Sequence, residues 1–127
     1  MSVTNEQRQY RVFIVSKDQH TVKQLVFDLA SKCNQTWFSP DPYKSSYPPT
    51  EENPDAIIYD SRLGVEVGIA IKYLAGEIPV IPLVIGPDAD TYKGWNNAFA
   101  KPLYAPWTNK SLLDALESAI KNAPQSR

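Results

Sequence analysis

The stretch that decides the fold is the apolar run Asp55-Ala56-Ile57-Ile58-Tyr59-Asp60, which ends on a carboxylate. Its composition is typical of a short buried strand. A later run, Asn97-Ala98-Phe99-Ala100, ends on the pair Lys101-Pro102. Open α/β sheets place their sites at the carboxyl ends of their strands. A charged pocket that contains Asp60 and Lys101 is therefore predicted at one edge of a sheet.

Strands and helices alternate outward from this run. A first strand is predicted over residues 10–15, and Asp18 is suited to cap the helix that follows, whose apolar residues recur at helical spacing. The other predicted elements are a weak strand at 35–38, the strand at 55–59, a helix at about 65–75 that ends near Gly76, a strand at 78–85, a brief strand at 98–100 and a final helix around 112–120.

Two segments and one residue depart from this alternation. Residues 39–54 hold five of the eleven prolines, a composition that favours an extended or turn-rich excursion. Residues 88–97 are compatible with a short helix or a turn. Pro82 removes a hydrogen bond from its strand, so either that position faces an open edge or the strand bulges there.

The alternation predicts one flavodoxin-like α/β domain, a doubly wound five-stranded parallel sheet with helices on both faces. The domain takes in residues 1–127, with a core at about 10–122 and polar tails at both ends.

The composition is that of an ordinary globular protein, with 43% hydrophobic and 21% charged residues. The net charge of −1 gives no support for nucleic-acid binding. A single cysteine excludes an internal disulfide framework and fits a reducing compartment. The polar N-terminus lacks the apolar core of a signal peptide, and no apolar run approaches the ~20 residues of a membrane helix. A cytoplasmic location without membrane contact is expected.

The order of these elements and residues resembles the receiver domain of two-component response regulators, over roughly residues 10–120. In that family an acidic pair after the first strand binds magnesium, and an aspartate ending the third strand accepts phosphate. A Thr or Ser ends the fourth strand, an aromatic switch lies on the fifth, and a Lys-Pro pair ends it. The matching residues are Asp60 for the acceptor, Gly68 for the glycine entering the third helix, Pro79-Val80 for the start of the fourth strand, and Lys101-Pro102, for which the resemblance implies a cis peptide.

Other positions depart from the family. Ser16-Lys17 stand where the acidic pair belongs, with Asp18 next, while Val84 replaces the hydroxyl and Ala98 the switch aromatic. Phosphoryl transfer to a carboxylate needs a divalent cation, which hard oxygen ligands hold. Lys17 in the place of the metal repels such an ion, and it is expected either to pair with Asp60 or to extend into solvent.

The resemblance therefore implies a pseudo-receiver, a signalling interaction module that is not an enzyme and holds no cofactor. Aromatic residues indicate its contact surface: Trp95 near Ala98, and Tyr104 with Trp107 in what looks like an insertion after Lys101. Tyr and Trp are favoured at protein interfaces. Trp95 and Trp107 are equally suited to cover the ends of a small core. The expected partner is a signalling protein or a second copy of the chain.

Two alternatives stay open. The first is a working receiver that is phosphorylated on Asp60, with Asp18 and Asp60 holding magnesium. The second is a small-ligand module of the same fold. Against it, the glycines at positions 64, 68, 76, 86 and 94 are scattered and form no phosphate-binding loop.

Overall fold

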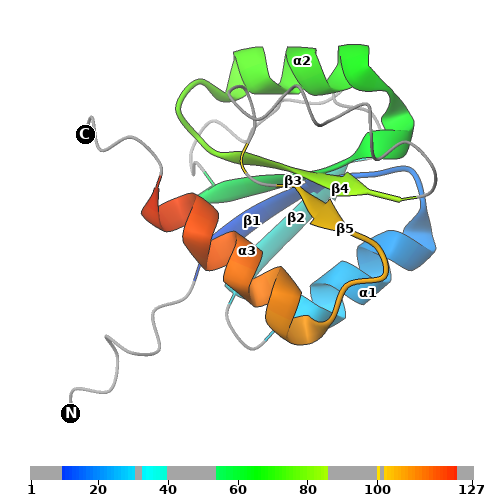
Figure 1. Ribbon diagram of the computed structural model, residues 1–127, viewed down its shortest axis with the longest axis vertical. Helices are drawn as coiled ribbons and strands as arrows, with labels where there is room; N and C mark the ends of the chain where they lie inside the picture. Colours follow the sequence, from blue (N-terminus) through cyan, green and yellow to red (C-terminus); the bar gives the residue numbers. More distant parts are fainter. Residues whose placement is uncertain (1–9, 31–32, 40–53, 86–99, 101, 123–127) are drawn as a thin grey trace.

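A parallel sheet forms the centre of the molecule, for which we obtained a computed structural model (Figure 1). The structure describes residues 10–30, 33–39, 54–85, 100 and 102–122. The strands lie in the order β2-β1-β3-β4-β5, and all neighbouring strands are parallel. Their bounds are β1 Tyr10–Val15, β2 Cys33–Ser39, β3 Ala56–Asp60, β4 Val80–Val84 and β5 Leu103–Tyr104.

Helices cover both faces of the sheet. The described helices are α1 (Gln19–Leu29), the short 3-10 helix η2 (Ser61–Leu63), α2 (Val65–Ala75) and α3 (Asn109–Lys121). Figure 1 shows α2 above the sheet and both α1 and α3 below it. The predicted doubly wound α/β class is confirmed, since parallel strands need crossover connections of this kind. No described helix has the length and apolar character that crossing a membrane requires.

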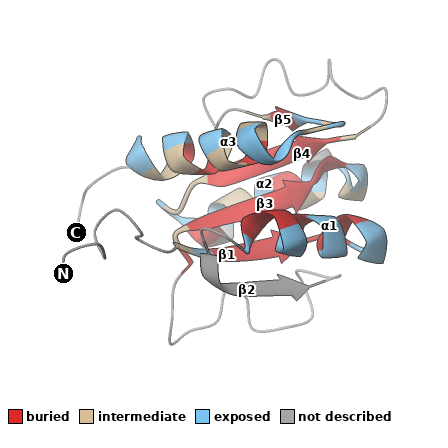
Figure 2. Cartoon of the chain, turned by 90° about the horizontal axis from the view of Figure 1, so that it is seen from below, coloured by how far each residue is buried: buried red, intermediate tan, exposed pale blue. Residues whose placement is uncertain are grey.

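Two hydrophobic clusters lie on opposite faces of the sheet, because alternate strand residues point to opposite sides. On β1, Val12 and Ile14 belong to the cluster between the sheet and helices α1 and α3, whereas Phe13 and Val15 belong to the cluster between the sheet and α2. Every residue of β3 and β4 is buried, as Figure 2 shows. A strand that is buried on both faces has a continuous apolar sequence, which explains why these two strands could be predicted.

The helix ends follow their local sequence. Asp18 caps α1 as predicted, because its side chain accepts a hydrogen bond from the His20 amide at 3.0 Å. Gly76, at a φ of 66°, ends α2 as predicted, a backbone conformation that favours glycine. Thr108 and Ser111 form a capping box at the start of α3.

The described strand β5 lies later in the chain than the strand predicted over residues 98–100. Leu103 and Tyr104 pair with Leu83 and Val84, so β5 follows Lys101-Pro102 instead of preceding it. Ala100 donates a hydrogen bond to the Val80 carbonyl at 2.9 Å, so the chain already runs beside β4 at that point. Residues 98 and 99 of the predicted strand lie outside the described residues, and Ala100 is described but belongs to no strand.

Pro82 fits its strand without a bulge. It lies opposite Tyr59 in an unbroken β3–β4 register, and the β5 ladder begins one position later, at Leu83. The proline therefore occupies a position at which the described β5 ladder has not started, which is how sheets accommodate this residue. The predicted excursion at 39–54 lies almost wholly outside the described residues, and so does the segment 88–97.

Candidate functional site

Asp60 is the last residue of β3 and lies at the carboxyl edge of the sheet, as predicted for the end of a buried strand. Its side chain is only 3% exposed. The carboxylate also caps the turn that follows, because Oδ1 accepts a hydrogen bond from the Arg62 backbone amide at 3.0 Å. Asp60 is therefore both a strand end and the first residue of a fixed turn.

The carboxylate of Asp60 receives four hydrogen bonds from described donors. Oδ1 accepts from the Arg62 amide and from Arg62 Nε, both at 3.0 Å. Oδ2 accepts from the Ser16 hydroxyl at 2.7 Å and from Arg62 Nη2 at 2.8 Å. A carboxylate offers about four lone-pair sites, so these donors fill its capacity. Asp60 is buried with its charge neutralised by Arg62.

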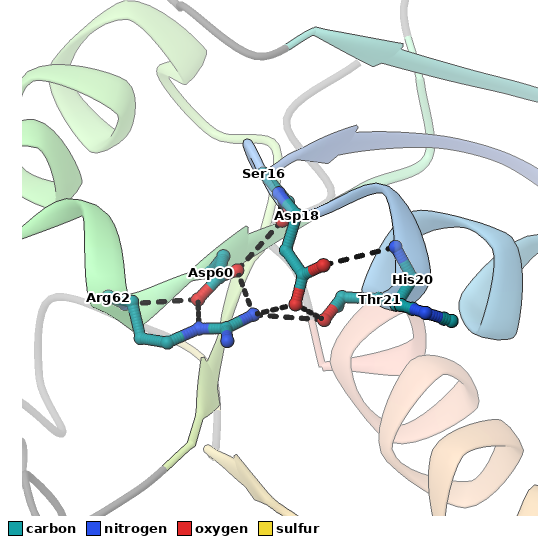
Figure 3. A network of polar contacts seen from close by, with 6 residues as sticks. All are labelled: Ser16, Asp18, His20, Thr21, Asp60 and Arg62. Carbon is teal, nitrogen blue, oxygen red and sulfur yellow. Dashed lines mark hydrogen bonds and ion pairs between the residues drawn. The ribbon is translucent and has the colours of Figure 1, made fainter.

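The same guanidinium reaches the second carboxylate of the site (Figure 3). Arg62 Nη2 lies 3.0 Å from Asp18 Oδ2 and 2.9 Å from the Thr21 hydroxyl oxygen. The Thr21 hydroxyl in turn donates to Asp18 Oδ2 at 2.9 Å. Asp18 and Thr21 stand on the first turn of α1, so Arg62 joins the end of β3 to the start of that helix.

The local charges are consistent with this arrangement. The hydrogen bond from the Thr21 hydroxyl has the largest effect on the pKa of Asp18 and lowers it; desolvation opposes this, and Arg62 and the His20 amide lower the pKa further. The hydrogen bonds that Arg62 donates to the Asp60 carboxylate raise the pKa of Arg62. Arg62 and Asp18 are partly exposed, at 39% and 38% of their side-chain surface. The cluster is therefore dry at Asp60 and open to water at Asp18.

The turn that carries Arg62 is held from the opposite side of the sheet. Tyr59, fully buried beneath α2, donates a hydrogen bond from its hydroxyl to the Gly64 carbonyl. Gly64 has a φ of 106°, which favours glycine over all other residues. At Gly68 a Cβ atom would lie 2.7 Å from the Tyr59 ring, so only glycine lets α2 come this close. The β3–α2 turn is thereby fixed on both sides.

The predicted pocket residues are brought together only in part. Ser16 is 1% exposed and contacts Asp60 directly, and its hydroxyl oxygen also accepts from the Asp18 amide at 3.1 Å. Lys17 is exposed, and its predicted ion pair with Asp60 is absent from the described contacts, where Arg62 takes that place. The alternative prediction, that Lys17 extends into solvent, fits the structure. Lys101 and the peptide it forms with Pro102 lie outside the described residues.

Val84 supplies no polar group to the site. It is 2% exposed and belongs to the hydrophobic cluster beneath α2, together with Val15 and Tyr59. At the corresponding end of β4 the chain therefore offers packing and no hydroxyl.

The residues of the predicted contact surface are also only partly among the described residues. Trp95 and Ala98 lie outside the described residues. Tyr104 is 46% exposed on β5. Trp107 packs against the core beneath α1 and α3, and its indole donates to the buried carboxylate of Asp28 at 3.1 Å. The structure thus gives Trp107 the core-covering role that the sequence left open.

Arg62 is the site residue that the sequence interpretation missed. It lies two residues beyond Asp60, and an aspartate that caps a turn places the second following amide against its own carboxylate. The side chain of the same residue also reaches Asp60, through Nε and Nη2. The sequence therefore indicated the turn after Asp60, whereas the predicted cation was Lys17, after the first strand.

Response regulators are among the solved structures that resemble this fold, and three of them illustrate the likeness. The N-terminal signal receiver domain of a response regulator from Bacteroides fragilis has a TM-score of 0.76 and 23% sequence identity, and the match covers 87% of this chain and 95% of that one. A response regulator receiver domain protein from Clostridium thermocellum has a TM-score of 0.74 and 19% identity, with coverages of 87% and 94%. A response regulator from Thermotoga maritima has a TM-score of 0.75 and 17% identity, with coverages of 90% and 99%. The fold is thus the response-regulator receiver fold, as the sequence resemblance implied.

Sequence comparison adds nothing to this likeness. No protein-family model matches the chain, and no curated protein does. At identities of this size the likeness shows the fold alone, so function must be argued from the site.

The receiver fold implies a magnesium ion beside the strand-end aspartate, and the described residues do not fit one. Both Asp60 oxygens are taken by donors, and the nearest second carboxylate, Asp18, is bridged to Asp60 by a cation. Magnesium needs oxygen ligands at 2.0–2.1 Å in near-octahedral geometry. Among the described residues, no three His, Cys, Asp or Glu side chains gather in one place.

Proposed function

We propose that this domain is a pseudo-receiver, a signalling interaction module that works without phosphorylation of Asp60. The observation that carries the proposal is the state of the Asp60 carboxylate, which is buried and accepts hydrogen bonds from Ser16 and from the amide, Nε and Nη2 of Arg62. A receiver needs that carboxylate free to attack phosphorus. Here its lone pairs are engaged.

The chemistry of phosphoryl transfer explains why this arrangement opposes reaction. The attacking oxygen must release its donors, and a divalent cation must neutralise charge that spreads over the phosphoryl oxygens. Arg62 holds both carboxylates that could bind such an ion. Its guanidinium would have to leave before the metal could enter. We therefore expect no catalysis and no bound cofactor.

A domain of this kind would act by binding another protein. We place this contact in the cytoplasm and expect no nucleic acid to take part. Tyr104 is exposed on the short edge strand β5, beside a groove of about 590 Å³ between β5 and α3. The groove is lined in part by Pro102, Pro106 and Ala115. Thr108, Ser111 and Asp114 also line the groove, so its surface is mixed. An exposed tyrosine beside such a groove is suited to a protein partner, either a signalling protein or a second copy of the chain.

The decisive experiment is incubation with acetyl phosphate and MgCl₂, followed by intact-mass measurement, with a working receiver domain treated in parallel. Beryllofluoride with magnesium, read by tryptophan fluorescence, gives an independent readout. We expect no mass increase and no magnesium-dependent quenching in the wild-type chain. A mass increase that the Asp60→Asn variant abolishes would show a working receiver and refute the proposal.

A further inference from the structure

We propose that Arg62 is the resident cation of this site, held within the chain at the position where the receiver fold implies a divalent ion. The inference deepens the proposed function, on which it rests, by assigning the metal independence of the domain to one residue. It follows from the mismatch between the described residues and a magnesium site.

The first argument is the set of atoms around the guanidinium. Arg62 Nη2 lies within 3.0 Å of three oxygens, at 2.8 Å from Asp60 Oδ2, 2.9 Å from Thr21 Oγ1 and 3.0 Å from Asp18 Oδ2. Two carboxylates and a hydroxyl are the oxygen ligands that hard cations select in proteins. One nitrogen of the chain therefore occupies the point at which these three oxygens converge (Figure 3).

The second argument is that Arg62 is anchored there. Its Nε and Nη2 atoms hold the two oxygens of Asp60 in the side-by-side geometry that suits guanidinium and carboxylate. Its backbone amide binds the same carboxylate, and Tyr59 fixes the turn from the opposite face through Gly64. A dissolved ion would have to displace a tethered cation whose local concentration does not fall on dilution.

The third argument is charge. Without Arg62, the described site would keep the carboxylates of Asp18 and Asp60 close together, with Asp60 only 3% exposed. A buried charge that loses its partner is strongly destabilising. A cation therefore stabilises the folded site, and Arg62 supplies it whatever the composition of the solvent.

The spacing of the oxygens predicts which ion could replace Arg62. They stand 2.8–3.0 Å from Nη2. Calcium binds oxygen at 2.3–2.6 Å with flexible geometry, whereas magnesium needs 2.0–2.1 Å and gives up its water reluctantly. Less contraction is needed for calcium, so an Arg62→Ala variant should be stabilised more by Ca²⁺ than by Mg²⁺.

The test is thermal unfolding of the wild-type chain and Arg62→Ala in NaCl, CaCl₂ and MgCl₂ at matched ionic strength. The wild-type curves should coincide in the three salts. Arg62→Ala should unfold at a lower temperature in NaCl and recover roughly 4–8 °C in CaCl₂ at about ten times its dissociation constant, with a smaller gain in MgCl₂. Calorimetric titration with CaCl₂ should detect binding to the variant alone.

Two further variants make the result specific. Adding Asp18→Asn to Arg62→Ala should abolish the recovery, because one of the two carboxylates is then lost. Lys110→Ala removes an exposed ion pair with Asp114 on α3 and should show no difference between the salts. If Arg62→Ala does not fold in any of the salts, Arg62→Gln takes its place, since its amide retains donors without the charge.

Three results would overturn the inference. They are a wild-type chain already stabilised by Ca²⁺ or Mg²⁺, an Arg62 variant as stable as the wild type in NaCl, and a recovery that persists without Asp18. None of them requires phosphorylation of Asp60. Conversely, a wild-type chain modified by acetyl phosphate would refute the proposed function even if the Arg62 variant gained calcium binding, so the two failures are distinguishable.

Discussion

Asp18 is the residue that makes the stability of the site depend on pH. It caps α1 through the His20 amide, accepts from the Thr21 hydroxyl and pairs with Arg62. These contacts all favour its charged form, and they lower its pKa below the usual 3.8. A group with a lowered folded pKa stabilises the fold above its unfolded pKa, and this stability is lost as the pH falls through the folded value.

The pH dependence of unfolding tests this role. Between about pH 6 and about pH 2.5, the urea midpoint of the wild-type chain should fall further than that of Asp18→Asn. Asparagine caps helices as well as aspartate does, so the variant removes the titration and retains the cap. The other carboxylates titrate in both proteins and cancel in the difference. Equal declines would mean that Asp18 carries no charge-dependent stability.

Helix α1 makes polar contacts with other elements at both of its ends. Its first turn holds Arg62, as described above, whereas the buried carboxylate of Asp28 near its last turn accepts from Gln24 at 3.0 Å and from the Trp107 indole at 3.1 Å. The side chain of Asn109 donates to the Asp28 carbonyl at 2.9 Å. The start of α3 is thus fastened to α1 by hydrogen bonds as well as by apolar packing.

The Trp107→Phe variant tests the contact at the element scale. It keeps an aromatic ring and removes the donor, so it should cost about 1–3 kcal/mol in the free energy of unfolding, because Asp28 loses a partly buried hydrogen bond to its carboxylate. Urea unfolding of Trp107→Phe, Asp28→Asn and the double variant measures the coupling. We expect about 0.5–3 kcal/mol for residues in direct contact. Additive effects would show that the indole contributes through packing alone.

Elements were predictable from the sequence where local signals and burial agree. The strands at β3 and β4, the caps at Asp18 and Gly76 and the stripe of α3 follow from periodicity and capping chemistry. The two-residue strand β5 did not follow, because so short a ladder leaves no periodic signal. Arg62 and the Asp28–Trp107 contact depend on tertiary proximity, since Asp28 and Trp107 are 79 residues apart in the chain.

At the scale of the whole molecule, the fold was predictable and the partner was not. The alternation of strands and helices limits the topology to a few choices, and the similar solved structures agree with the predicted class. A surface carries no comparable rule. Exposed apolar side chains occur on several elements, including Phe27 on α1, Tyr73 on α2 and Tyr104 on β5.

A pair of tyrosine variants tests which of these surfaces meets the partner. Tyr104→Ala should weaken capture of a partner, or self-association measured by sedimentation, by about tenfold or more, as expected for an aromatic anchor beside a groove. Tyr73→Ala is the matched control, because Tyr73 is 85% exposed on α2, a helix on the opposite face of the sheet from α3. If only Tyr73→Ala weakened binding, the face of α2 would be the contact surface.

The neighbouring residues Tyr59 and Asp60 give the end of β3 a further property. Tyr59 is buried beneath α2 and holds Gly64, whereas Asp60 holds the amide of Arg62 and meets Ser16. Two adjacent residues thus hold both ends of the same short turn, Tyr59 at Gly64 and Asp60 at Arg62. Because two contacts hold this turn and the Asp60 side chain is only 3% exposed, the amide hydrogen of Arg62 should exchange with solvent on the timescale of global unfolding, as strand amides do, although it lies outside any strand.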